Sequence, residues 1–265
     1  MVHMSSPKSL ITKHSPLVVI VGETGSGKSE LALKLAKQFN SEIICADSRT
    51  VYKGMDIGTA KPSKTDQKTT KHHLLDIVWP SQRFTVVDFK KLANEAIKDI
   101  SSRAKLPILV GGTGLYVDSV IYDFKFNSSS ERNPLNPRHR LKNSSPETEL
   151  RDNTLVIGLK NNKQDLEKRL TNRVEAMVSN GLVDEVRTLM KKYPSDSKAL
   201  EGTSYKSFKK YLDGELEIDE AKRLFVSYDL ALAKRQRTWF KRNKSIHWVD
   251  NGDDVVVLVT TFLNK

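Results

Sequence analysis

The feature that most constrains this chain is the octapeptide Gly22–Ser29, which reads GETGSGKS and matches the pattern G-x-x-x-x-G-K-[S/T]. It follows an apolar, β-branched run, Leu17–Val21, and precedes a segment whose apolar residues recur at helical spacing. A strand, a glycine-rich turn and a helix in this order form a P-loop, because backbone N–H groups and the positive end of the helix converge on phosphate oxygens. The sequence therefore predicts that the whole loop binds phosphate groups, through Gly22, Glu23, Thr24, Gly25, Ser26, Gly27, Lys28 and Ser29.

Two loop residues have distinct expected roles. Lys28 supplies a mobile cation, and the Ser29 hydroxyl is the expected ligand of Mg²⁺. A nucleotide hydrolase normally ends another strand with an aspartate, but here the apolar run Pro107–Val110 leads into Gly111-Gly112-Thr113-Gly114 without a carboxylate. This pattern disfavours an ATPase or GTPase motor. The glycines indicate either a backbone that lies close to a ligand, to which Thr113 offers a hydroxyl, or a plain glycine turn.

A second candidate site residue, Asp47, directly follows the strand-like segment Glu42–Ala46. It should project from the carboxyl edge of the sheet beside the P-loop, where ligands of open α/β sheets bind. A carboxylate there can accept a proton from an incoming nucleophile or can cap a turn, and its position favours the base. The same features suit phosphoryl transfer to a hydroxyl, so a small-molecule kinase is an open alternative at this point.

Alternating strand and helix signals predict an α/β fold with a P-loop NTPase-like parallel sheet, flanked by helices and followed by a helical C-terminal part. We expect a flexible N-terminus at residues 1–15, a P-loop core at 16–127, a linker at 128–152 that is rich in Ser and Pro, and helices at 153–265 that complete the core. Inside these ranges the pattern predicts a helix near 87–101, a strand at 154–159 and a last long helix from 219 to about 242. It also predicts a strand at 255–259.

The apolar pattern and the net charge predict where the protein is located and what type of partner it binds. The apolar runs are too short to cross a membrane and no signal peptide is visible, so we expect a cytoplasmic protein. The single Cys45 excludes a cysteine-based metal site, and the adjacent His72 and His73 would face opposite ways in a strand, so no metal site is expected from these residues. The 44 Lys and Arg against 32 Asp and Glu leave a net charge of +12, which favours a polyanionic partner.

Taken together, these segments resemble the tRNA dimethylallyltransferase family, whose members transfer a dimethylallyl group from dimethylallyl diphosphate to N6 of an adenosine next to the anticodon, position 37. The resemblance covers roughly residues 16–126 and 152–250. It is carried by the P-loop and by Asp47-Ser48, Tyr52–Pro62, His73–Asp76, Phe84, Asp88-Phe89, Gly111–Tyr116, Arg169–Arg173, Gly181-Leu182, Glu185-Val186, Ala233–Gln236 and Trp239-Phe240.

The resemblance implies roles for these residues. The P-loop would bind the diphosphate of the prenyl donor with Mg²⁺ at Ser29, and the second substrate would be tRNA. We expect the protein to be a monomer and not to associate with a membrane. The implied catalytic residues are Asp47 as the base, with Arg173, Lys28 and Thr24. The implied tRNA-binding residues are Asp47, Ser48, Arg49, Thr50, Thr113, Lys234, Arg235 and Gln236.

The chain also departs from the family pattern. The short segment 128–152 stands where relatives carry a sizeable helical insertion, Thr50 stands where a glutamine is common, and Leu230 stands where an arginine is common. A prenyltransferase that acts on free adenine nucleotides would explain the short segment, but the positive charge speaks against it. A noncatalytic RNA-binding protein would be expected to have lost Asp47, Lys28 or Arg173, and all three are present.

Overall fold

The computed structural model describes residues 14–126, 149–160, 163–194, 196–250 and 253–264. Most of the predicted flexible N-terminus and of the predicted linker, 1–13 and 127–148, lies outside these residues. The described strands form one parallel sheet in the order β3-β2-β4-β1-β5-β6. Their bounds are β1 Leu17–Val21, β2 Glu42–Cys45, β3 His72–His73, β4 Pro107–Gly111, β5 Thr154–Leu159 and β6 Ile246–Val249.

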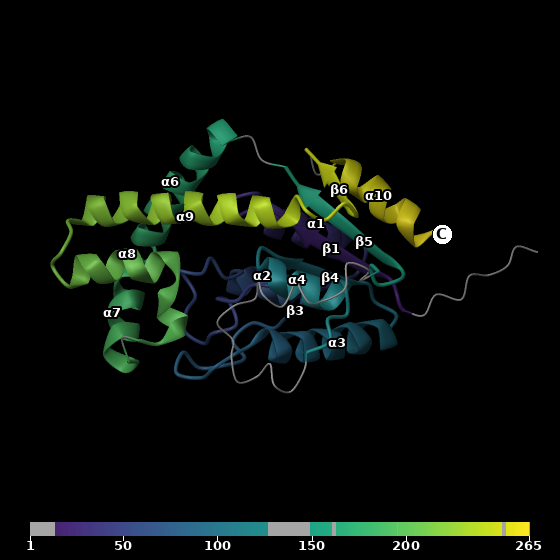
Figure 1. Ribbon diagram of the computed structural model, residues 1–265, viewed down its shortest axis with the longest axis horizontal. Coiled ribbons are helices and arrows are strands. Elements are labelled where there is room, and N and C mark those ends of the chain that lie inside the picture. The colour runs from purple at the N-terminus through teal and green to yellow at the C-terminus, as the bar shows by residue number, and fades with distance from the viewer. Residues whose placement is uncertain (1–13, 127–148, 161–162, 195, 251–252, 265) are drawn as a thin grey trace, which may run out of the picture.

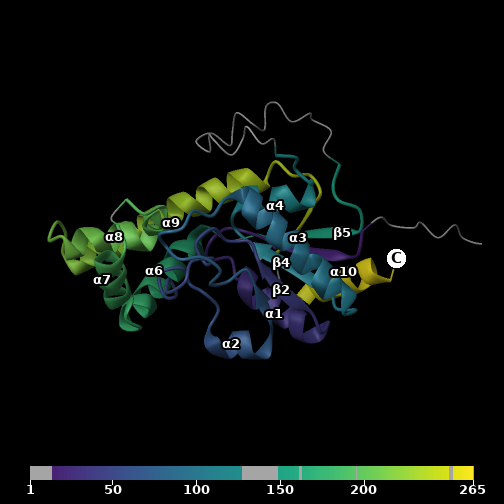
Figure 2. The ribbon, with the colours of Figure 1, turned by 90° about the horizontal axis from the view of Figure 1, so that it is seen from below.

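Helices cover both faces of the sheet. The first helices along the chain are α1 Lys28–Gln38, α2 Lys64–Thr69, α3 Val86–Ser102 and α4 Gly114–Ile121. The later ones are α6 Lys163–Ser179, α7 Leu182–Lys192, the short 3-10 helix η2 Lys198–Glu201, α8 Thr203–Leu212, α9 Ile218–Phe240 and α10 Asp253–Leu263. The expected α/β fold with a parallel sheet, and the expected helical C-terminal part, are confirmed (Figures 1 and 2).

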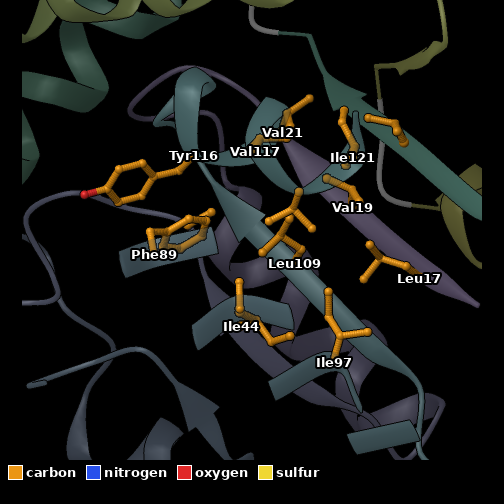
Figure 3. Close-up of a cluster of buried hydrophobic side chains, with 14 of the residues drawn as sticks. Leu17, Val19, Val21, Ile44, Phe89, Ile97, Leu109, Tyr116, Val117 and Ile121 are labelled. Carbon is orange, nitrogen blue, oxygen red and sulfur yellow. The ribbon is translucent and has the colours of Figure 1, made fainter. Parts of the chain in front are cut away.

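Alternation along the strands divides the core into two layers. Side chains such as Val19 and Leu109 face α3 and α4, where Phe89 stacks on Tyr116 with ring centroids 4.2 Å apart (Figure 3). The intervening residues, such as Ile20, face α1 and α10. Because both faces of the strands are buried, each central strand is a continuous apolar run, which is why β1 was recognisable from sequence.

The C-terminal segment differs from the prediction. Residues 255–259 were predicted to form a strand, and this is wrong, because they lie inside α10. Val255 and Val259 are four positions apart and both are buried against the sheet, whereas Val257 between them is 68% exposed. This spacing is helical, and the strand that follows β5 at its edge of the sheet is instead β6, which the sequence analysis did not identify.

A second apolar cluster joins α6, α7, α8 and α9 to the loop that follows β2. Phe208 and Phe225 pack edge to face at its centre, and Val51 and Met55 of that loop are fully buried in it. The 23-residue helix α9 runs from this cluster to the sheet (Figure 1). It thereby brings C-terminal residues next to the P-loop. Among the described residues, no helix combines the length and apolar character needed to cross a membrane.

Candidate active site

The P-loop has the predicted strand–turn–helix geometry. Gly25 and Gly27 have φ values of +74° and +83°, in the left-handed region that glycine adopts without strain. Gly27 is the N-cap of α1, no side chain caps that end, and the helix begins at Lys28. The first backbone N–H groups of α1 therefore lie at the loop, in the arrangement that binds anions.

Charged residues from several elements surround Lys28. Burial lowers the pKa of Lys28 to about 8, and the nearby Arg173 guanidinium adds to this lowering, while Asp47, Glu23 and Asp229 oppose it. The Lys28 Nζ donates a hydrogen bond to the Glu23 carbonyl at 3.2 Å. A partly buried ammonium beside a second cation is a poor site for an isolated charge, and an anionic ligand would stabilise both groups.

Arg173 lies at the P-loop, as the resemblance implied, and a buried acid orients it. Its Nη1 donates to Thr24 Oγ1 at 3.0 Å, and its Nη2 pairs with Asp229, which is 1% exposed. The other carboxylate oxygen of Asp229 accepts from Thr203 Oγ1 at 2.8 Å. Burial raises the pKa of Asp229 and the Arg173 guanidinium counteracts this effect. Thus α6, α8 and α9 together set the position of one arginine, and Asp229 and Thr203 were not predicted.

Helix α9 also contacts the P-loop directly. Gln236 Oε1 accepts from the Thr24 backbone N–H at 2.7 Å, and its Nε2 donates to the Gly112 carbonyl at 3.0 Å. Arg237 Nε donates to Glu23 Oε2 at 2.8 Å, and its Nη2 forms an ion pair with the same oxygen at 2.7 Å; Glu23 is 4% exposed. Gln236, which was predicted to bind tRNA, joins two loops of the site, and its contact with tRNA stays a prediction. Lys234 and Arg235, by contrast, are exposed and pair with no acid among the described residues.

Asp47 follows β2 and caps the turn that leads away from the strand. Its Oδ1 accepts from the backbone N–H groups of Arg49 at 2.7 Å and Thr50 at 3.4 Å. The Ser48 backbone N–H donates to Thr113 Oγ1 at 3.1 Å, which joins this turn to the one after β4. The two alternatives weighed for Asp47 are therefore compatible, because one oxygen serves the turn while the carboxylate stays near Lys28.

The outer part of the same turn consists of Arg49 and Thr50. The Arg49 guanidinium donates to the carbonyls of Lys198 and Ala199 in η2. Thr50 is buried, and its hydroxyl oxygen has no hydrogen-bond partner in the described part of the chain. Hydrogen bonds thus hold this turn both to Thr113, in the turn after β4, and to η2.

The glycines at the end of β4 and just after it lie close to other parts of the protein. A Cβ at Gly111 would lie 2.0 Å from the Ala46 carbonyl oxygen, and one at Gly114 would lie 2.2 Å from the Trp239 ring. A Cβ at Gly112 would lie 2.4 Å from the Gln236 amide. The lack of side chains here lets the end of β2 and helix α9 lie against this turn, and the predicted approach to a ligand stays a prediction.

A carboxylate that was not predicted as a site residue organises the loop after β2. Glu185 of α7 accepts hydrogen bonds from three successive backbone N–H groups, those of Asp56, Ile57 and Gly58, at 2.8 to 2.9 Å. The Tyr205 hydroxyl donates a fourth bond to it at 2.8 Å. The family resemblance named Glu185 without a role, and only the folded chain shows what it contacts.

A separate ionic cluster lies at the start of β2, at the opposite edge of the sheet from the P-loop. Glu42, His73 and Asp99 place ligand atoms within 4.8 Å of one another. Glu42, however, is already paired with Arg103 and with Lys105, and these cations hold the pKa of its carboxyl well below the usual range. The positive neighbours make this an ion-pair cluster, in which a further cation would be repelled.

Comparisons with known proteins agree with this geometry. The chain matches the family model described as IPP transferase over residues 50–152 and 131–243. A tRNA dimethylallyltransferase of Anoxybacillus flavithermus is 35% identical over 285 residues, covering 91% of this chain and 92% of that protein. One from Thermoanaerobacter sp. is 38% identical over 285 residues, covering 88% and 90%.

Solved structures agree with the sequence matches. The full-length tRNA isopentenylpyrophosphate transferase of Bacillus halodurans has a TM-score of 0.80 to this structure at 33% identity, covering 95% of this chain and 96% of that one. The corresponding enzyme of Staphylococcus epidermidis also has a TM-score of 0.80, at 30% identity, covering 94% and 99%. With a family model that matches most of the chain and relatives aligned over nearly their whole length, this protein belongs to the IPP transferase family of tRNA dimethylallyltransferases.

Proposed function

We propose that this protein transfers the dimethylallyl group of dimethylallyl diphosphate to N6 of the adenosine at position 37, next to the anticodon of tRNA. The observation that carries the proposal is the convergence of the P-loop, Arg173 and Asp47 around Lys28 in a chain of this family. The names of the relatives support a tRNA substrate and support neither a small-molecule kinase nor transfer to free nucleotides.

The P-loop would bind the diphosphate and stabilise it as it leaves. When the allylic C–O bond breaks, negative charge grows on the diphosphate oxygens. The backbone N–H groups at the start of α1, the Lys28 ammonium and the Arg173 guanidinium can each donate to these oxygens. Arg173 is held by Asp229 and Thr24, so little reorientation is needed when the charge develops.

Mg²⁺ fits the donor set at the start of α1. The Ser29 hydroxyl would offer one oxygen ligand from the first turn of the helix, and magnesium sites commonly combine one or two protein oxygens with substrate phosphates and water. When bound, the ion would neutralise charge on the departing diphosphate. Mg²⁺ and its ligand Ser29 are proposals.

Asp47 is the proposed base. Two backbone N–H groups hold its Oδ1, which fixes the orientation of the carboxylate and leaves Oδ2 to accept the proton that N6 loses as it bonds to the allylic carbon. An adenine that is stacked in the anticodon loop cannot approach this edge of the sheet, so we propose that the base is extruded into the site. Thr113, bonded to Ser48, lies in the adjoining turn and is proposed to contact the same base.

The exposed cations of α9 are the proposed contact with RNA phosphates. Lys234 and Arg235 face solvent on the helix that carries Gln236 to the P-loop, so RNA bound there would lie close to the site.

We also propose that the middle segment of this chain is shorter than that of its relatives. The alignment with the Anoxybacillus relative runs over 285 residues but takes in 91% of the 265 residues here, about 241, so roughly 44 positions have no counterpart. The two family-model matches overlap at 131–152.

The test is a transfer assay with three acceptors. Purified protein, Mg²⁺ and labelled dimethylallyl diphosphate are incubated in separate tubes with unmodified tRNA, AMP and ATP, and N6-prenylated adenosine is measured by mass spectrometry. Label in tRNA alone is the expected result. Label in AMP or ATP would move the activity to free nucleotides, and label in none would contradict the proposal and direct the test to phosphoryl transfer from ATP. The cytoplasmic location and monomeric state stay predictions.

A further inference from the structure

An exposed tryptophan between two lysines forms an unusual surface feature away from the P-loop. Trp79 lies in the loop between β3 and α3 and is 45% exposed. The Lys53 Nζ lies 4.8 Å from the centroid of its ring, and the Lys192 Nζ lies 5.1 Å from it. Lys53 comes from the loop after β2 and Lys192 from the end of α7, so three separate elements form this cluster, which we call the Trp79 platform.

The backbone around Trp79 is firmly placed. Its N–H donates to the Gln82 side chain at 2.7 Å, and the carbonyl of the preceding Val78 accepts from the Lys53 N–H at 2.8 Å. The carbonyl of the following Pro80 accepts from the Ser197 hydroxyl. An exposed indole on a backbone anchored at both neighbours loses little further freedom when a partner binds it.

The charges of the platform are uncompensated. Neither Lys53 nor Lys192 pairs with a carboxylate among the residues that the structure describes, whereas the neighbouring Lys61 forms bridges of 2.6 Å to both Asp56 and Asp76. The remaining large exposed apolar side chains of the described chain, Val257 and Leu263, lie on α10. Trp79 is therefore not part of a broad apolar patch of the kind that binds another protein.

Hydrogen bonds link the loop that carries Trp79 to the proposed adenosine site. Ser197, which contacts the Trp79 loop, directly precedes η2, and the carbonyls of Lys198 and Ala199 in η2 accept from Arg49. Arg49 in turn belongs to the turn that Asp47 caps. One series of hydrogen bonds therefore joins the Trp79 loop to the residue proposed as the base.

We infer that the Trp79 platform is a second contact for the tRNA substrate, in which an unpaired base displaces the two ammonium groups from the indole and stacks on it, while Lys53 and Lys192 turn to bind the flanking phosphates. The inference rests on the proposed function. Aromatic rings with adjacent cations suit single-stranded RNA, because every base offers a π-face and every linkage a phosphate. An unpaired base outside the site, rather than the reacting adenosine, is the occupant.

The test compares tRNA binding by substituted proteins without the prenyl donor, using fluorescence anisotropy of labelled tRNA. Trp79→Leu keeps an apolar side chain but removes the π-face, and the Kd should rise about 5- to 150-fold. Trp79→Phe keeps an aromatic face and should lose less. The double variant Lys53→Ala, Lys192→Ala should reduce the slope of log Kd against log salt by about 1.4, at about 0.7 for each phosphate contact on a single strand. The donor affinity should not change.

The matched control removes two lysines elsewhere. Lys37 of α1 and Lys98 of α3 are exposed and pair with no acid among the described residues, so their double alanine variant carries the same change in net charge. An equal loss of tRNA affinity in this control would show a general charge effect and would overturn the inference. Trp79→Leu with wild-type tRNA affinity would also overturn it, although prenylation of tRNA by the same protein would leave the proposed function standing. A wild-type protein that does not bind tRNA would contradict both.

Discussion

The carboxylate of Glu185 offers the sharpest test of how the site is held together. It accepts four hydrogen bonds: Oε2 accepts from the N–H groups of Asp56 and Ile57, and Oε1 accepts from Gly58 and the Tyr205 hydroxyl. Successive N–H groups that converge on one anion form a nest, which here closes the loop that follows β2 onto α7. Glu185→Ala removes all four acceptor contacts at once.

The size of the effect follows from which donors water can reach afterwards. Asp56 is exposed and its N–H can bond to water, whereas Tyr205 is 2% exposed, and Ile57 and Gly58 are half-buried. A hydrogen bond to a charged group contributes about 1.5 to 3 kcal/mol, so the equivalent of two lost bonds lowers the free energy of unfolding by about 3 kcal/mol. Glu185→Gln keeps one acceptor oxygen but turns an amide N–H toward a donor, and should cost about half as much.

The assay is urea denaturation followed by circular dichroism, together with hydrogen exchange of residues 54–62. Exchange of the Ile57 and Gly58 amides should rise strongly in Glu185→Ala. The control is Glu95→Ala on the exposed side of α3, which should stay within about 0.5 kcal/mol of the wild type. A Glu185→Ala protein with wild-type stability and unchanged exchange at 54–62 would refute the nest as the element that holds this loop.

Three further predictions concern the charged centre. Asp47→Asn keeps an acceptor for the turn but cannot take the N6 proton, so kcat should fall about 10²- to 10⁴-fold with little change in KM for the donor, and near-normal kcat would remove Asp47 as the base. Lys28 loses its charge as pH rises through about 8, so pyrophosphate should bind the free enzyme more weakly above that pH, whereas Lys28→Arg should show no such midpoint by titration calorimetry. Because this pKa lies below its ordinary value of 10.5, the unfolded chain binds the extra proton between the two values, and the contribution of Lys28 to stability rises with pH across that window. Asp229 raises the pKa of Lys28, so Asp229→Asn should move the same midpoint below 8, and an unmoved midpoint would contradict the coupling.

Local patterns predicted the sheet well where burial is continuous. The runs that became β1, β4 and β5 were identified from their β-branched residues, because strands buried on both faces carry no polar interruptions. The same composition led to the wrong prediction for 255–259. This run is helical, and its fully buried residues, Val255 and Val259, are spaced by four positions on the face that packs against the sheet. The short β6 has one buried residue, Ile246, and therefore little alternation to recognise.

The site was predictable only in part. The residues at strand ends and in the P-loop follow from local sequence, whereas the contacts from α9 join residues that are far apart in the sequence. The P-loop and Asp47 follow directly from strand ends and glycine spacing. The bonds from Gln236 to Thr24 and from Arg237 to Glu23 join residues 212 and 214 positions apart, and no spacing in one sequence indicates them. The pairing of Arg173 with Asp229 likewise depends on how α6 packs on α9.

The contacts between α9 and the P-loop also constrain the order in which a working molecule can appear. The ribosome synthesises residues 22–29 more than 200 residues before Gln236 and Arg237, which bond to that loop. A nascent chain can thus form β1 and α1 long before the loop has its final partners. Contacts between residues so distant in sequence also form slowly during folding. A polypeptide released before residue 236 would therefore carry the P-loop sequence without its two α9 contacts, so incomplete synthesis should yield inactive fragments that lack a fully formed phosphate-binding loop.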